Sequence, residues 1–394
     1  MKARPDAMWY RLMLARACAW ALLVAGWIGI GSFALAFAPS VSVGCGLVAL
    51  WLFALGAVAA VATRGGMRHW TRALALCVGG AVTAAGLWWT LHGGALGAVL
   101  LALLGWAALT ALASGVVRSL RVAQSAVPEP PIVPASLGAL GAGLVLGDIG
   151  DLPSLALRLA VFVGSVAVAL LLLQSRIDGR PRAPGCRAGL FDCSLPAWPA
   201  GAWRDALQWP ALLSGLAMLP MMAALPLMAA WCRAESVAPQ TMVLLHLAGM
   251  FGPALILRRS IPRWSPRALS MICTVLLASG AALGLLAEAP VNLLAIAVAH
   301  GAAWGIAWSG QLWAPERRGR QGASPLHAAA GYALLTVLFG LIVEQAGTPG
   351  VVAVHAVLGV AAFAVWTFEF ATGLRSRNPA VRGHLPAARR HESG

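Results

Sequence analysis

The chain is poor in charge and poorer still in acid. Only 10% of its 394 residues are charged, with 13 acidic residues against 28 basic ones. A soluble domain of this length needs a far more charged surface, so a water-soluble globular protein is excluded. The seven cysteines form no CxxC pair and no disulfide framework. The sequence also lacks a nucleophile elbow, a phosphate-binding glycine loop and a zinc signature, so we do not expect an enzyme.

Long apolar segments recur from one end of the chain to the other, and 60% of the residues are apolar. About 20 apolar residues in a helix cross a hydrocarbon core of roughly 30 Å. We therefore predict an all-α membrane protein with twelve transmembrane helices, at residues 17–38, 41–63, 73–91, 95–117, 132–150, 155–174, 207–231, 239–257, 268–287, 291–313, 325–343 and 350–374. The fifth of these spans is the weakest, because four glycines dilute it.

The basic residues are distributed unevenly along the chain. If the N-terminus is cytoplasmic, 26 of the 28 Lys and Arg fall in cytoplasmic segments, and only Arg158 and Arg233 lie elsewhere. This is the positive-inside pattern, and it predicts that both termini are cytoplasmic. We assign the net charge of +15 to topology and to contact with the lipid bilayer, not to nucleic acid. The apolar run of the first span exceeds that of a signal peptide, which predicts a retained anchor. The excess of Arg over Lys, with abundant Ala and Gly, suggests a bacterial inner membrane.

The longest polar interruption lies at residues 175–206 and contains four prolines and five arginines. It divides the chain into a six-helix half at 1–174 and a second at 207–374, followed by a basic cytoplasmic tail at 375–394. This arrangement resembles the major facilitator superfamily, in which two halves rock about a site near the membrane midplane. The signature loop of that superfamily is poorly kept, because residues 64–68 retain glycine and basic character without the usual acid.

Acidic residues gather at the predicted outer face of the membrane. Two interpretations remain open: a mildly negative mouth that concentrates cations, or ordinary loop residues. The residues concerned are Asp148, Asp151, Glu235, Glu288 and Glu344. Either of the first two could also form a salt bridge with Arg158 or relay protons.

Two short patterns occur on consecutive spans, Met218-x-x-x-Met222 and His246-x-x-x-Met250. Residues four apart lie on one face of a helix, and all four side chains fall near the centre of their spans. Three thioethers and a neutral imidazole form a soft ligand set, for which Cu(I) is the main biological candidate. We therefore predict a metal site that holds copper as a transported substrate, and no resident cofactor. Pro220 lies between the two methionines of the first pattern and is expected to distort that turn.

With these two patterns, the chain resembles the CcoA-like copper importers of the major facilitator superfamily, which carry an MxxxM on the seventh helix and an HxxxM on the eighth. Met218 and Met222 match the first motif, and His246 and Met250 match the second. The resemblance implies copper import from the periplasm into the cytoplasm, to supply a cytochrome c oxidase. It also implies a cytoplasmic copper chaperone or oxidase assembly factors as partners. Among the cysteines, only Cys232 offers a correspondence with the family.

Two rival functions and several side-chain roles stay open. The protein could transport a small organic solute, or it could be a polytopic oxidase assembly factor. His300 could be an additional ligand, a proton carrier or a packing residue, and His327 and His355 have weaker claims to any of these roles. Cys186 and Cys193 could form a transient metal relay or remain idle thiols.

Overall fold

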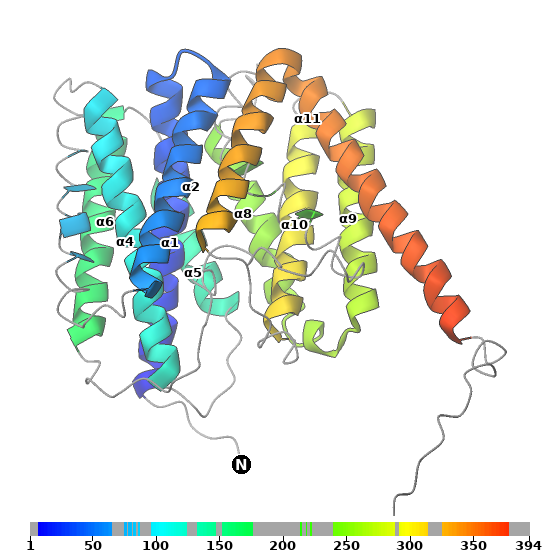
Figure 1. The fold of residues 1–394 in the computed structure, drawn as a ribbon, viewed down its shortest axis with the longest axis horizontal. Coiled ribbons are helices and arrows are strands. Elements are labelled where there is room, and N and C mark those ends of the chain that lie inside the picture. Colours follow the sequence, from blue (N-terminus) through cyan, green and yellow to red (C-terminus); the bar gives the residue numbers. More distant parts are fainter. Residues whose placement is uncertain are drawn as a thin grey trace, which may run out of the picture.

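The computed structural model describes residues 7–64, 96–123, 132–146, 152–175, 239–287, 291–313 and 325–377, and isolated residues between 75–86 and 213–222. Within these ranges the chain is helical and contains no strand (Figure 1). The elements are α1 (Ala7–Phe37), α2 (Val41–Arg64), α4 (Leu96–Ala123), α5 (Ile132–Leu146), α6 (Leu152–Ser175), α8 (Pro239–Ile256), η4 (Ile261–Arg263), α9 (Pro266–Leu286), α10 (Val291–Trp313) and α11 (Pro325–Arg377).

The helices confirm an all-α, multi-pass membrane protein. Seven of them are long and apolar enough to cross a membrane, and α5 and α8 are shorter apolar helices. The third and seventh predicted spans are described only at isolated residues, which are helical. Every other predicted span coincides with a helix to within a few residues, apart from two differences. The predicted linker lies outside the described residues, as do its two cysteines.

The first difference is the start of α1, which begins at Ala7 and not at residue 17. The apolar run begins only after the last basic residue of the leader, Arg16, whereas a helix can continue beyond the hydrocarbon core. Arg16, assigned to the cytoplasmic leader, is buried in this helix. The long aliphatic stem of an arginine allows such burial, because it packs against apolar neighbours.

The second difference is the turn between the last two spans. A loop was expected from 344 to 349, yet helix continues on both sides of a single non-helical residue, Gly347. Its φ of 57° and ψ of −143° are readily reached by glycine alone, and Pro349 follows two residues later. In Figure 1 the chain reverses direction here, so that α11 contains two spans and ends on the side of the bundle where α1 begins.

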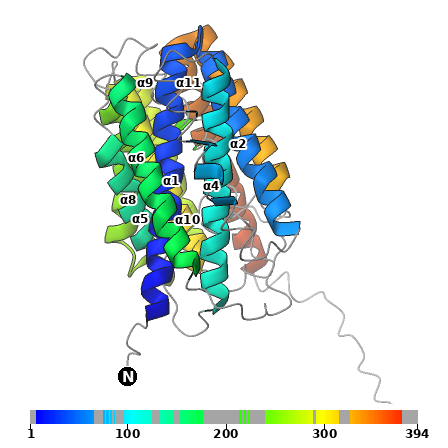
Figure 2. The same ribbon diagram turned by 90° about the vertical axis from the view of Figure 1, so that its left-hand side faces the viewer.

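Burial separates central helices from those that face lipid. Almost every side chain of α1 between Ala15 and Ala34 is buried, and α1 packs against α4, α5 and α6 (Figure 2). A helix that is apolar and buried on all sides belongs in the interior of a bundle. In contrast, α6 exposes a stripe of large apolar side chains at helical spacing, as expected for a lipid-facing surface: Leu157, Val161, Val168 and Leu172.

Helices from the two ends of the chain meet along α2 and α11. The backbone N–H of Ser42, in the first turn of α2, donates to Glu344 Oε2 at 2.9 Å. A carboxylate at a helix N-terminus is favourable, because unpaired N–H groups give that end a partial positive charge. One turn before Glu344, a Cβ at Gly340 would lie 2.6 Å from Cβ of Cys45, so the two helices are in very close contact. Glu344 is therefore part of a specific interhelical contact.

Candidate functional site

His246 lies in the middle of α8 and is fully buried. Its Nδ1 lies 2.7 Å from the backbone oxygen of Ala297 on α10. A carbonyl oxygen can only accept, so Nδ1 carries the proton of the neutral ring and donates it. Nε2 is then left with a lone pair, and this atom is buried with no hydrogen-bond partner. An imidazole fixed through one nitrogen, with the other nitrogen unpaired, is the usual arrangement of a metal-ligating histidine.

Met250 follows His246 by one helical turn and is also fully buried. The two side chains lie on the same face of α8 because four residues complete about one turn. This part of the sequence-based prediction rests on local geometry, and the helical conformation of α8 agrees with it.

Close packing between α8 and α10 brings His246 within reach of Ala297. Gly301 and Gly305 form a G-x-x-x-G pair on α10. A Cβ at Gly301 would lie 2.7 Å from the backbone oxygen of His246, and one at Gly305 would overlap the carbonyl of Met250. Small residues at this spacing allow helix backbones to approach closely in a membrane. This pair was not among the predicted site residues, although its G-x-x-x-G spacing is visible in the sequence.

Met218 and Met222 are helical and buried, with exposures of 1% and 3%. Pro220 lies outside the described residues, so the predicted distortion stays untested. One turn before Met218, the carbonyl oxygen of Ser214 accepts a hydrogen bond from His300 Nε2 at 2.9 Å. Ser214 of the seventh span is therefore in contact with α10. Convergence of the four predicted ligands on one ion stays a prediction.

Among the residues that the structure describes, no three His, Cys, Asp or Glu side chains gather as a metal-binding group. Cys18, Cys45 and Cys273 are buried free thiols, and Cys232 lies outside the described part of the chain. A soft-metal site made of thioethers and an imidazole stays a prediction from the sequence patterns.

Four aromatic side chains form a cluster next to Met250. Trp20 of α1 contacts Phe251 of α8, and Trp304 and Trp308 of α10, with ring centroids 5.3–6.0 Å apart. All four are buried, and the two α10 rings stack on each other. In the predicted topology this cluster lies one turn closer to the cytoplasm than His246. The cluster was not predicted, although Trp304 and Trp308 have helical spacing in the sequence.

A second histidine, His300 on α10, pairs with His355 in the second span of α11. The distance from His300 Nδ1 to His355 Nε2 is 2.8 Å, and both side chains are buried. His300 was the stronger candidate from the sequence, and His355 had a weaker claim. Residues 55 positions apart show no local pattern that would connect them.

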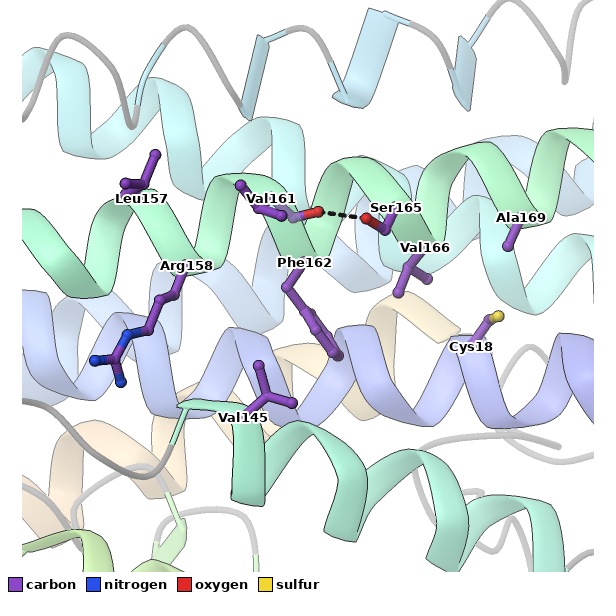
Figure 3. A pocket seen from close by; sticks show the side chains of 9 residues that line it. All are labelled: Cys18, Val145, Leu157, Arg158, Val161, Phe162, Ser165, Val166 and Ala169. Atoms are coloured by element: carbon purple, nitrogen blue, oxygen red, sulfur yellow. Dashed lines mark hydrogen bonds between the residues drawn. The ribbon is translucent and has the colours of Figure 1, made fainter.

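A separate hollow of about 520 Å³ lies among α1, α5 and α6 (Figure 3). Its lining is apolar apart from Arg158 and Ser165, and the Ser165 hydroxyl donates to the carbonyl of Val161 at 2.8 Å. Leu157 and Val161 at its rim are exposed, so it opens toward the lipid. His246 is not among its lining residues. The acids predicted to pair with Arg158 lie outside the described residues.

The fold is shared with solved transporters, although no family profile and no curated protein matches the chain. The nucleoside transporter NupG is 16% identical, with a TM-score of 0.60 over 93% of this chain and 99% of that one. A bacterial homologue of the human drug peptide transporters PepT1 and PepT2 is 11% identical, with a TM-score of 0.59 over 94% and 98%. The major facilitator superfamily proton:xylose symporter XylE is 12% identical, with a TM-score of 0.57 over 92% and 95%. The chain therefore has the twelve-helix fold of the major facilitator superfamily.

Proposed function

We propose that this protein is a secondary transporter that moves Cu(I) from the periplasm to the cytoplasm across a bacterial inner membrane. The observation that carries the proposal is the unpaired, buried Nε2 of His246, one turn from the thioether of Met250. Polar groups at this depth are costly and usually functional. Nitrogen and thioether sulfur together select a soft monovalent cation.

Met218 and Met222 complete the proposed site. The carbonyl of Ser214 accepts from His300, and the carbonyl of Ala297, three residues earlier on α10, accepts from His246. In the predicted topology the seventh span and α10 run antiparallel. Met218, four residues outward from Ser214, is therefore expected at about the same depth as Ala297. Met218 is thus expected at the same depth as His246, with Met222 one turn further out.

An uncharged ligand set suits transport. Thiolates bind copper tightly, whereas thioethers and imidazole hold a cation that must leave again. The resemblance to the CcoA-like importers supports the inward direction, delivery to a copper chaperone or oxidase assembly factors, and a role in cytochrome c oxidase biogenesis. We further propose that residues 1–174 and 207–374 are the two moving halves, that 175–206 links them in the cytoplasm and that 375–394 is a cytoplasmic tail.

A small organic solute is the second candidate substrate. The solved structures with this fold include transporters named for nucleosides, drug peptides and xylose. On this alternative, His246 and the methionines line an organic pocket, and their soft-ligand character has no role. An oxidase assembly factor is the third candidate, and the absence of any long predicted domain outside the membrane weighs against it.

Copper uptake in cells that carry single alanine variants tests the proposal. At matched protein levels, Met218→Ala, Met222→Ala, His246→Ala and Met250→Ala should each reduce uptake at least tenfold. Met221→Ala and Met242→Ala are matched controls, because both remove a fully buried thioether outside the pattern. Silver, a Cu(I) mimic, should compete while zinc should not. Unchanged uptake in the four site variants would overturn the proposal, as would competition by zinc.

A further inference from the structure

Three polar contacts run in a line through the buried histidine pair. The carbonyl oxygen of Ser214 lies 2.9 Å from His300 Nε2. His300 Nδ1 lies 2.8 Å from His355 Nε2, and His355 Nδ1 lies 3.1 Å from the carbonyl oxygen of Val351. The line therefore begins and ends at backbone oxygens and joins three segments: the seventh span, α10 and the second span of α11.

The three contacts need three protons, whereas two neutral imidazole rings supply only two. Both ends are carbonyl oxygens, which only accept, so His300 Nε2 and His355 Nδ1 must each carry a hydrogen. A neutral imidazole has one N–H, and each ring has used it at the carbonyl. Two bare lone pairs would then face each other across 2.8 Å, which is repulsive. One additional proton between His300 Nδ1 and His355 Nε2 converts this contact into a hydrogen bond.

A metal ion does not fit between the two rings. Imidazole nitrogens bind zinc at about 2.0–2.1 Å, and two such ligands at a tetrahedral angle are separated by roughly 3.3 Å. The observed 2.8 Å is shorter than that and is typical of a nitrogen–nitrogen hydrogen bond. A proton is the only cation small enough for this position.

We propose that His300 and His355 form an intramembrane proton-binding site that holds one proton shared between the two rings. The positive charge is stabilised by charge-assisted hydrogen bonds to the carbonyls of Ser214 and Val351. Loss of the proton to water leaves the two lone pairs opposed, so one ring must turn away from its carbonyl. Protonation of the pair is thereby linked to contact among the seventh span, α10 and α11, the helices whose relative movement transport requires.

Among the described side chains around the pair, no buried carboxylate could replace it. The most extensive helix contacts of α10 are with α8, α9, η4 and α11. Their titratable and charged side chains are His246 on α8, Arg267 and Cys273 on α9, Arg263 on η4, and His327, Tyr332, Glu344, Glu369, Arg375 and Arg377 on α11. Among those whose side chains the structure describes, His246, Cys273 and Tyr332 are buried. None of these is an acid, so within the described interior of these helices no carboxylate competes with the histidine pair for the proton.

A proton on the pair and a cation at His246 repel each other. The carbonyl of Ala297 orients His246, and His300 lies three residues after Ala297 on α10. The histidine pair and the proposed cation site are therefore within one turn of each other along α10. Like charges at this separation in a membrane interior disfavour simultaneous occupancy. Cation entry therefore releases the proton, and the pair couples the two fluxes as an exchange. This consequence rests on the proposed function, whereas the proton site itself does not.

Nitrogen-15 NMR of the histidine-labelled protein in nanodiscs tests the proton site without any substrate. The shared proton should produce a through-bond coupling between one nitrogen of each ring, together with a strongly deshielded proton signal. Both signals should be lost in His300→Gln and in His355→Gln. They should persist in His327→Gln, a control on the first span of α11, where the side chain is exposed. Absence of the coupling in the unmodified protein at every pH from 5 to 8 would overturn the proposal.

Proteoliposomes with a trapped pH dye test the coupling. With copper outside as Cu(I), an interior one pH unit more acidic should raise copper accumulation about tenfold, as expected for exchange of one proton per ion. His355→Gln should still admit copper but show no response to the gradient, and His327→Gln should respond like the unmodified protein. A full response in His355→Gln would contradict the coupling. If the unmodified protein admits no copper, the proposed function fails, while the NMR result still decides the proton site.

Discussion

Alanine at Gly301 or Gly305 tests whether close contact between α8 and α10 holds His246 in place. A Cβ at Gly301 would lie 2.7 Å from the backbone oxygen of His246, and an ordinary contact requires the helices to separate by about 0.7 Å. The same separation would stretch the hydrogen bond from His246 to Ala297 from 2.7 Å to about 3.4 Å. Gly305 demands a larger movement, because its Cβ would overlap the carbonyl of Met250.

Two energetic costs follow from this separation. Overpacking a tight interface costs about 1–3 kcal/mol, and leaving a buried hydrogen bond unmade costs about 1–3 kcal/mol. We therefore expect the free energy of unfolding to fall by about 2–6 kcal/mol in either variant. Without the hydrogen bond to Ala297, the His246 ring directs Nε2 toward the ion less often. The affinity for Ag(I) should therefore fall at least tenfold.

The assay combines thermal unfolding in nanodiscs with calorimetric titration of Ag(I). Gly252→Ala is the matched control, because Gly252 lies on α8 and a Cβ there would meet no atom within 4 Å. Gly252→Ala should unfold and bind silver like the unmodified protein. The reasoning is refuted if Gly301→Ala and Gly305→Ala match this control in both measurements.

Three further perturbations test other contacts. Glu344→Gln removes the charge at the N-terminus of α2 and should speed maleimide labelling of the buried thiol of Cys45 beside it; an unchanged rate would contradict this. Gly347→Ala places a side chain at a φ of 57° and should lower stability by about 1–2 kcal/mol, seen as a lower Tm; an equal Tm would show that the turn tolerates alanine. Trp20→Ala removes the ring that joins α1 to Trp304 and should cost about 3–5 kcal/mol in denaturant unfolding; a loss below about 1 kcal/mol would rule out a tightly packed cluster.

Local patterns in the sequence predicted much of the fold. Apolar runs located the helices because each span must satisfy its own backbone hydrogen bonds within the hydrocarbon core. The shared face of His246 and Met250 followed from the period of one helix. The start of α1 and the turn at Gly347 were missed, because apolar runs mark the hydrocarbon core and contain no direct signal for helix ends.

Contacts between helices could not be predicted from these patterns. The carbonyl of Ala297 is 51 residues from His246, and His355 is 55 residues from His300. Such pairings depend on which faces pack together, and the period of a single helix holds no information about its partner. Copper as the substrate, and the contribution of Met218 and Met222, stay predictions.

X-ray absorption at the copper edge of the purified protein in nanodiscs, loaded with one equivalent of Cu(I), tests the central claim most directly. We predict that copper is retained with both imidazole nitrogen and thioether sulfur in its first coordination shell. The nitrogen contribution should disappear in His246→Ala and persist in Met221→Ala. A shell without sulfur, an unchanged nitrogen contribution in His246→Ala, or failure of the unmodified protein to retain copper would contradict the claim.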